Sequence, residues 1–312
     1  MEPKIWPERA DWQGGSSFNS LFPFMDIPAT RDLSNADYAI LGLPFDGSTL
    51  LRPGARFGPR AIRAAFSLLD RYSDNPQQRD PPYSQLRVVD YGDAPLVSYH
   101  PEETLARTQQ AVETLLGADV QPICLGGDHS LSLGCVRACA AKYGPLALVM
   151  LDAHPDFWTS PPNLTAYHSN WLRVAVEEGA VDPNRCIHVG FRRSNSMTIL
   201  DRVLASNITV VTTDDVRRLG VGHALEAIRK VVGESLYISL DIDCVDPAFA
   251  PGTGVPEVGG FTSIEILELV RGLKGLPVVG FDVMEVSPAY DHAEITALLA
   301  ATLVYEYLMS RL

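Results

Sequence analysis

The chain has 312 residues, of which 46% are hydrophobic, and this suits a globular protein with a substantial core. Its formal net charge of −13 argues against a nucleic-acid partner and against an anionic membrane surface. No apolar stretch approaches the ~20 residues that a membrane-spanning helix needs.

Short apolar runs recur along the chain, and stretches with helical periodicity separate them. The runs predict strands at 38–43, 86–90, 120–125, 146–151, 186–189, 208–211, 236–240 and 277–281. The stretches 101–116, 130–142 and 222–232 place apolar residues near the ~3.6-residue period of a helix. Strands that alternate with helices predict an α/β fold in which a parallel sheet is covered on both faces.

The chain shows no internal repeat and no linker that would divide it. Residues 1–35 have little periodicity, so we expect an N-terminal arm followed by a single domain at 36–312. The first residues lack the basic and apolar blocks of a secretory signal, and the five cysteines form no CxxC pair. These features favour a cytoplasmic protein with reduced thiols.

Three short runs carry carboxylates and imidazoles that can bind metals. They are GGDHS at 126–130, DAHPD at 152–156 and DID at 241–243, and each follows a predicted strand. Ligands bind outside the carboxyl ends of strands in open α/β sheets, so the runs can converge although they are distant in sequence. Carboxylates crowded together without a cation would repel one another. The runs therefore either lie far apart or surround a metal, and we favour the metal.

The number of potential ligands favours two cations. Extended backbone directs residues i, i+2 and i+4 to one side, which would let the ligands of each run face a common site. Two cations that share bridging carboxylates fit the count better than a single zinc ion does. Oxygen and imidazole nitrogen ligands suit Mn²⁺, with Ni²⁺ as the alternative. The six candidate ligands are His129, Asp152, His154, Asp156, Asp241 and Asp243.

In this order, GGDHS, DAHPD and SLDIDCVDP resemble the metal motifs of the ureohydrolase (arginase/agmatinase) family. Four further blocks also resemble that family, so the similarity covers nearly the whole chain. The resemblance implies a three-layer α/β/α fold with a roughly eight-stranded parallel sheet and a dinuclear Mn²⁺ centre. The four blocks are LPFD at 43–46, RPGARFGP at 52–59, GTGVPE at 252–257 and FDVMEV at 281–286.

Carried over by motif, the ligands divide into two sets. The resemblance implies that Asp152 and Asp241 bridge both metals, that His129 and Asp156 complete one set, and that His154 and Asp243 complete the other. Asp128 is not a ligand in that pattern, and we expect it to orient the loop or a ligand. We expect Asp246 to brace the turn before Pro247.

The implied reaction is hydrolysis at a guanidinium carbon. Metal-bound hydroxide attacks the planar carbon, and the tetrahedral intermediate collapses to urea, or a related product, and an amine. Glu285 matches the family position that holds the cationic group, and His168 matches the histidine proposed to carry a proton to the leaving amine. Taken alone, Glu285 could be a surface-loop residue and His168 an ordinary loop histidine.

The segment after the second metal motif departs from the family pattern. His168 is followed by Ser-Asn-Trp where the family usually reads HGT, and Phe157 and Trp158 stand where arginase-like members often have polar residues. These two aromatics either pack in the core or a lid, or form a substrate-binding wall that contacts a delocalised cation. The polar contacts by which arginases recognise an amino-acid head group are not evident. We therefore expect an agmatinase-like enzyme, with guanidinobutyrate, guanidine or a biguanide as other candidate substrates.

Two alternatives belong to other classes of protein. A metal-dependent deacetylase would need a single zinc ion and an amide substrate, and the six ligands and Glu285 argue against it. A noncatalytic subunit of a ureohydrolase-like oligomer would not need the complete ligand set. The resemblance also implies a small cationic guanidino substrate and a homo-oligomer, either a trimer or a hexamer, with a hetero-oligomer as the alternative.

Overall fold

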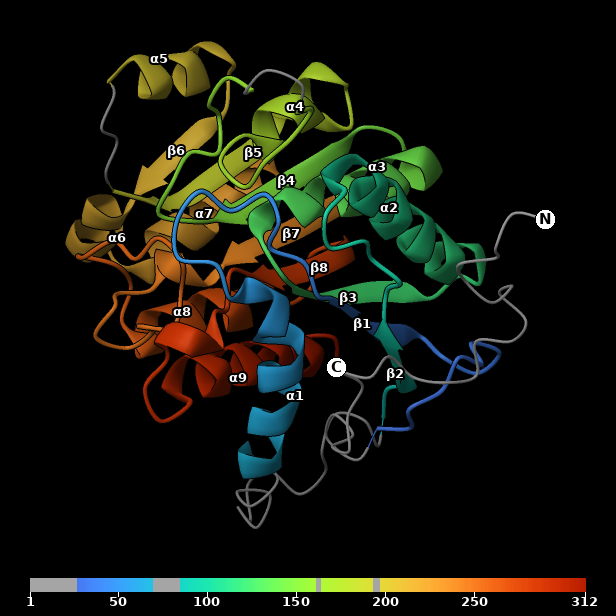
Figure 1. Cartoon of the computed structure of the whole chain (residues 1–312). Helices are drawn as coiled ribbons and strands as arrows, with labels where there is room; N and C mark the ends of the chain where they lie inside the picture. Colours follow the sequence, from blue (N-terminus) through green and yellow to red (C-terminus); the bar gives the residue numbers. More distant parts are fainter. Residues whose placement is uncertain (1–26, 70–84, 161–163, 193–196) are drawn as a thin grey trace.

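The computed structural model describes residues 27–69, 85–160, 164–192 and 197–312. Their strands form one eight-stranded sheet in the order β2-β1-β3-β8-β7-β4-β5-β6. Every neighbouring pair of strands is parallel. Helices cover both faces of this sheet (Figure 1), so the predicted three-layer α/β/α fold is confirmed.

The strands and helices alternate along most of the chain, as expected for parallel pairing. The strands are β1 (Tyr38–Leu43), β2 (Val88–Asp93), β3 (Gln121–Gly126), β4 (Leu146–Leu151), β5 (Val181–Phe191), β6 (Thr209–Thr212), β7 (Leu236–Asp241) and β8 (Val278–Met284). The α-helices are α1 (Gly58–Leu69), α2 (Pro101–Gly117), α3 (Ser132–Tyr143), α4 (Trp171–Glu177), α5 (Met197–Ala205), α6 (Thr213–Leu219), α7 (Val221–Val231), α8 (Ser263–Gly272) and α9 (Ile295–Met309). Short 3₁₀ helices are η3 (Ala55–Phe57), η6 (His129–Leu131), η7 (Ile242–Cys244) and η8 (Pro288–Tyr290).

The strands predicted from the apolar runs agree closely with the observed strands. Two predicted strands match β1 and β4 residue for residue, and the other six overlap an observed strand with shifted ends. The largest difference is β5, which begins at Val181, five residues before the predicted start. The first residues of β5 include Asp182 and Arg185, which are only partly buried. The apolar pattern therefore could not reveal where this strand begins. The predicted helix at 130–142 begins as the 3₁₀ helix η6 and continues as α3.

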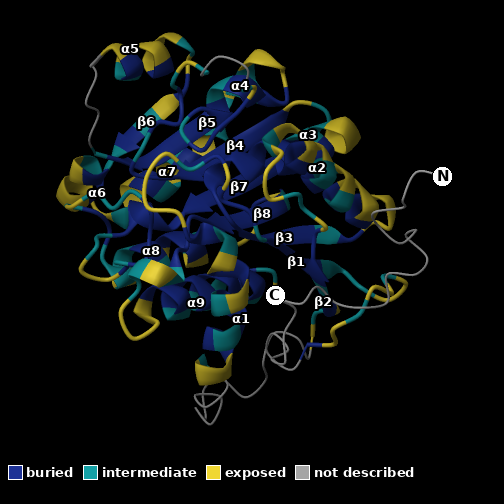
Figure 2. Ribbon diagram, viewed as in Figure 1, coloured by how far each residue is buried: buried dark blue, intermediate teal, exposed yellow. Residues whose placement is uncertain are grey.

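Each central strand contributes side chains to two hydrophobic cores. On β4, every second residue from Leu146 belongs to the core that also contains residues of α2, α3 and α4, whereas Ala147, Val149 and Leu151 belong to the core that contains residues of α1, α7, α8 and α9. All six residues of β4 are buried, and Figure 2 shows the sheet as the dark centre of the molecule. A strand covered on both faces is apolar at every position, which explains the uninterrupted run at 146–151.

The predicted N-terminal arm falls mostly outside the described residues, which begin at Ile27. Ile27 is buried in the core that also contains α1. Backbone hydrogen bonds then fix the next residues along β2, since Asp90 N donates to Pro28 O and Thr30 N donates to Asp90 O, both over 3.0 Å. The part of the arm that is described thus packs on the domain, while the boundary at residue 35 stays a prediction.

The lengths and compositions of the helices can be compared with those of membrane-spanning helices. Within the described ranges, none of the helices has both the length and the hydrophobicity that crossing a membrane requires.

The strand order brings four carboxyl ends together in the middle of the sheet. The strands β3, β8, β7 and β4 are consecutive neighbours. His129 follows β3 after two residues, Glu285 follows β8 directly, Asp241 ends β7 and Asp152 follows β4 directly. The predicted site residues therefore lie at one edge of the sheet, where open α/β folds bind their ligands.

Candidate metal centre and substrate site

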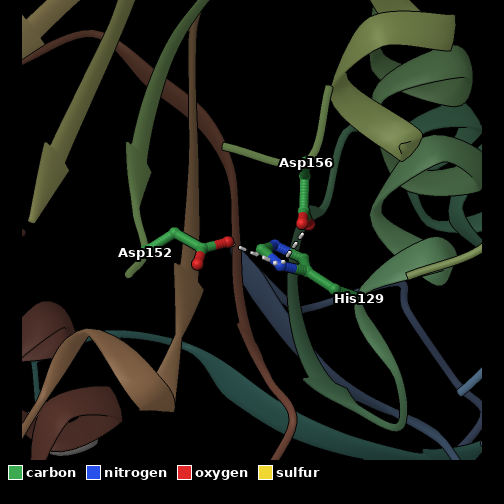
Figure 3. A group of neighbouring side chains, drawn as sticks. All are labelled: His129, Asp152 and Asp156. Carbon is green, nitrogen blue, oxygen red and sulfur yellow. Dashed lines mark ion pairs between the residues drawn. The ribbon is translucent and has the colours of Figure 1, made fainter. Parts of the chain in front are cut away.

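His129 stands at the centre of a first group of ligands. Its Nδ1 atom lies 3.1 Å from Oδ2 of Asp152, 3.2 Å from Oδ2 of Asp156 and 3.2 Å from Oδ2 of Asp241. All four residues are buried. Figure 3 shows the imidazole of His129 between the carboxylates of Asp152 and Asp156. Three carboxylate oxygens and one ring nitrogen thus face a common point.

His154 forms the second group with two of the predicted acids. Its Nδ1 atom lies 2.8 Å from Oδ2 of Asp243 and 3.6 Å from Oδ1 of Asp152. Asp152 therefore turns one oxygen toward each histidine, which is the arrangement of a bridging carboxylate. Asp241 belongs by these contacts to the first group only, and its Oδ1 accepts a hydrogen bond from Asp243 N over 2.8 Å. A bridging role for Asp241 stays a prediction.

The unsatisfied polar atoms of this cluster fit bound cations. Nδ1 of His129 and Oδ2 of Asp152 are buried without a hydrogen-bond partner, which is costly in a protein interior. Burial and the carboxylates of Asp243 and Asp152 raise the pKa of Asp241 well above its usual range. Burial and Asp152 likewise raise the pKa of Asp156 to about 7. Divalent cations would relieve this repulsion, and the oxygen and nitrogen ligands suit Mn²⁺.

A hydrogen-bond chain orients the imidazole of His129. Ser239 Oγ donates to Oδ1 of Asp282 over 2.7 Å, so its oxygen accepts from Nε2 of His129 over 2.9 Å. Asp282 also accepts from Ser132 Oγ and Tyr237 OH, each over 2.8 Å. With its proton on Nε2, His129 presents the lone pair of Nδ1 to the carboxylates, as a metal ligand must.

The sequence motifs do not include this chain of hydrogen bonds. Its one visible signal is Asp282, a single acidic residue inside the otherwise apolar strand β8. A buried carboxylate needs hydrogen-bond partners, and the register that places Ser239 opposite Asp282 on neighbouring strands supplies one of them.

The ligands of each run meet by a different local geometry from the predicted one. Residues 153 and 154 form a bend after β4 instead of continuing as extended backbone, and Asp156 has a positive φ of 43°. Asp243 lies in the 3₁₀ helix η7, whose N-cap is Asp241. Alternation along an extended chain was therefore the wrong reason for a convergence that the turns produce instead. The turns are stabilised by ligand side chains, since Asp152 Oδ1 accepts from His154 N over 2.6 Å.

Glu285 and His168 lie next to the first group of ligands. Oε1 of Glu285 accepts a hydrogen bond from His129 N over 3.0 Å and lies 3.4 Å from Nδ1 of His168. Leu50 N donates to Nε2 of His168 over 3.2 Å, so the neutral ring carries its proton on Nδ1, facing Glu285. Burial lowers the pKa of His168, but the carboxylate of Glu285 outweighs this and holds the pKa above its usual value.

Asp128 supports the loop that carries His129, as expected. Its carboxylate caps η6 by accepting from Ser130 N over 3.1 Å, and it accepts from Ser48 N over 2.9 Å. Burial and the nearby charge of Glu285 raise the pKa of Asp128 to about 7. Asp246 similarly braces its turn, since its side chain accepts hydrogen bonds from Ala248 N and Gly259 N.

The aromatic residues after the second metal motif lie against the core. Phe157 is 5% exposed and belongs to the core that contains α2, α3 and α4, while Trp158 is partly buried against the same core. These positions favour the packing alternative, and a role in substrate binding stays a prediction. Trp171, one of the residues in the segment that departs from the family pattern, is fully buried with its ring centroid 5.0 Å from that of His129.

Comparison with known proteins places the chain in a family. The model of the arginase family matches residues 36–310. The chain belongs to the arginase family. It is 40% identical to proclavaminate amidinohydrolase of Streptomyces clavuligerus over 96% of this chain and 97% of that protein. It is 40% identical to an agmatinase of Escherichia coli over 94% of both chains.

Solved structures of related proteins resemble this arginase-family chain over most of its length. The structure of proclavaminate amidinohydrolase from Streptomyces clavuligerus gives a TM-score of 0.87 at 38% identity and covers 94% of this chain and 97% of its own. A hypothetical agmatinase from Burkholderia thailandensis gives 0.86 at 39% identity, with 94% and 91% covered. The protein is therefore a hydrolase of C–N bonds in amidino or guanidino groups. This membership favours the enzyme over the deacetylase and the noncatalytic subunit.

Proposed function

We propose that this protein hydrolyses a small guanidino compound to urea, or a related product, and an amine. The observation that carries the proposal is the position of Glu285. Its carboxylate is fixed by His129 N and lies beside His168, so a group that binds cations adjoins the metal ligands. A guanidinium ion held there would lie next to the point where His129, Asp152, Asp156 and Asp241 converge.

The six ligands would hold two divalent cations, Mn²⁺ by preference and Ni²⁺ as the alternative. When bound, such a pair lowers the pKa of water and stabilises negative charge on oxygen. His129 and His154 would provide the nitrogen ligands, one for each cation, and Asp152 would supply an oxygen to both.

The side chains around the cations would then position and protonate the substrate. Glu285 neutralises the guanidinium charge and orients its plane. His168, whose raised pKa keeps it protonated to a higher pH than an ordinary histidine, delivers a proton to the departing amine. Because Leu50 N donates to Nε2 of the neutral ring, which keeps its proton on Nδ1, we assign the transferred proton to Nε2.

The relatives narrow the class of substrate. They are named proclavaminate amidinohydrolase, guanidino acid hydrolase and agmatinase, at 38–40% identity. Agmatine and guanidino acids such as guanidinobutyrate are therefore our first candidates, followed by guanidine and biguanides. Phe157 and Trp158 remain candidates for substrate contact. We further propose a cytoplasmic homo-oligomer, a trimer or a hexamer.

A screen for urea and amine release tests this function. Metal-free protein would be loaded separately with Mn²⁺ and Ni²⁺ and incubated with agmatine, guanidinobutyrate, guanidine, a biguanide and arginine. We expect urea and the matching amine from at least one of the first four compounds. Activity confined to arginine would refute the substrate preference, and no turnover of any guanidino compound would refute the proposed function.

A further inference from the structure

Arg192 lies at the carboxyl end of β5, beside the loops that carry the second group of ligands. It follows Phe191, the last residue of β5, and β5 pairs with β4. Its backbone N–H donates to the carbonyl oxygen of Ala153 over 3.4 Å, within the run that also carries His154. The backbone of Arg192 is therefore joined to one of the two loops that form this group.

The guanidinium group of Arg192 reaches the other loop. It donates to the carbonyl oxygens of Asp243 and Cys244, the second of these over 2.9 Å. Both residues belong to the last part of the 3₁₀ helix η7, and the final carbonyl groups of a helix need donors from elsewhere. A further hydrogen bond, over 2.7 Å, goes to the carbonyl oxygen of Glu257. Because these acceptors are main-chain atoms, Arg192 fixes the backbone around the ligand Asp243.

Asp243 depends on several contacts for its position. Its backbone N donates to Oδ1 of Asp241 over 2.8 Å, and its own Oδ1 accepts from Ala153 N over 3.2 Å. Its carbonyl oxygen accepts from Arg192. Its Oδ2 faces Nδ1 of His154 at 2.8 Å. Removal of the Arg192 side chain would therefore release the backbone of this ligand but would leave the carboxylate itself unchanged.

The first group of ligands has a separate support. Nε2 of His129 is fixed by Ser239 over 2.9 Å, and its backbone N is fixed by Glu285 over 3.0 Å. Asp241 is the last residue of β7, so the sheet positions it before η7 begins. Loss of Arg192 should therefore affect the two groups of ligands unequally.

We propose that Arg192 is a positioning residue that holds Asp243 and the loop of His154 in place relative to each other, and so determines whether the second cation is bound. The proposal rests on the proposed function and adds the support for one half of its metal centre. Charge and position have opposite effects here. The positive charge of Arg192 repels a divalent cation, whereas ligands fixed in advance bind it more tightly.

The substitution Arg192→Met tests this role, because it removes the hydrogen bonds and the charge but keeps a long side chain. Metal-free protein would be titrated with Mn²⁺ by calorimetry, and metal analysis would count the ions bound per chain. We expect the unsubstituted protein to bind two ions. We expect the variant to bind the first ion normally and the second about 10–100-fold more weakly. EPR spectroscopy gives an independent readout, since exchange coupling between Mn²⁺ ions requires both sites of one chain to be filled.

Arg311→Met is the matched control for a purely structural role. Arg311 also donates to main-chain carbonyl oxygens, those of Leu276 over 3.0 Å and Leu273 over 2.9 Å. Both precede β8, whereas the ligands lie at the carboxyl ends of the strands. We expect this control to have a lower Tm but an unchanged affinity for both ions.

Arg192→Lys decides the question if Arg192→Met does not fold. Lysine keeps the charge but offers a single point of donation in place of the planar fork of arginine, so it cannot reproduce all the contacts. We expect it to bind the second ion about tenfold more weakly and the first ion normally. Unchanged or tighter binding of the second ion by either folded variant, or equal weakening of both ions, would overturn the proposal. Failure of the unsubstituted protein to bind a second ion would instead contradict the binuclear centre of the proposed function.

Discussion

Nε2 of His129 donates a hydrogen bond over 2.9 Å to Oγ of Ser239, which donates in turn to Asp282. The bond fixes both the orientation of the ring and the atom that carries its proton. Groups that orient a metal-binding histidine in this way affect metal affinity although they do not touch the metal.

Replacing Ser239 by alanine should therefore weaken metal binding. The imidazole of His129 would lose its acceptor and with it the bond that directs Nδ1 toward the carboxylates. We expect the affinity for Mn²⁺ to fall about 10–100-fold, measured by calorimetry on metal-free protein. Ser67→Ala, on the exposed side of α1, is the control and should bind Mn²⁺ normally. An unchanged affinity in Ser239→Ala would show that the hydrogen bond does not support the ligand.

Asp152→Asn should remove both cations rather than one. Its two oxygens face different histidines, at 3.1 Å from His129 and 3.6 Å from His154, so the substitution damages both groups of ligands. We expect metal analysis to find little bound metal and assays to find no turnover. Asp201→Asn, at an exposed position of α5, should retain both. An Asp152→Asn protein with two bound metals and full activity would refute the ligand assignment.

Glu285→Gln should separate substrate binding from metal binding. The amide oxygen can still accept from His129 N, so the loop and the metal content should remain unchanged. The neutral side chain no longer attracts a guanidinium ion, and we expect KM for the best substrate to rise at least about tenfold. Loss of metal from this variant, or an unchanged KM, would argue against the assigned role.

The same substitution should shift the titration of His168. Burial lowers the pKa of His168 and Glu285 raises it, with a net upward shift, so removal of the negative charge should lower the pKa. In the unsubstituted protein this pairing stabilises the folded state below the unfolded pKa of ~6.5, and the contribution is lost as the pH rises through the folded pKa. NMR titration of the histidine side chains in both proteins measures the shift. A pKa in Glu285→Gln equal to or above that of the unsubstituted protein would contradict the pairing.

The fluorescence of Trp171 should report metal binding. Its indole ring centroid lies 5.0 Å from the imidazole of His129, and its buried Nε1 has no hydrogen-bond partner. Mn²⁺ is paramagnetic and should quench emission from an indole so close to its ligand. We expect Trp171→Phe to remove most of the metal-dependent change, whereas Trp158→Phe should keep it. Equal quenching in Trp171→Phe and the unsubstituted protein would place the metal elsewhere.

The sequence predicted that the candidate ligands lie at the carboxyl ends of strands, because the end of a buried strand can be seen in the sequence. An uninterrupted apolar run that meets an acid, as at Asp152, marks both the strand and its carboxyl end. The strand order was not visible, so the register that sets Ser239 opposite Asp282 could not be foreseen. The left-handed backbone of Asp156 and Glu285 was also hidden, because only surrounding contacts stabilise that conformation in residues other than glycine.

Prediction of the substrate side of the site was less complete. The resemblance pointed to Glu285 and His168, but the contact between Leu50 N and His168 joins positions far apart in the sequence and uses a backbone atom. A contact made by a backbone atom cannot be inferred from the pattern of side chains in the sequence.

The most direct test of the proposed binuclear centre is a titration of metal-free protein with Mn²⁺, with the rate of urea release from the best guanidino substrate as the readout. The two groups of ligands that share Asp152 predict a rate that rises until two ions are bound per chain and then stays constant. Full activity with a single bound ion, or hydrolysis independent of added metal, would contradict the account.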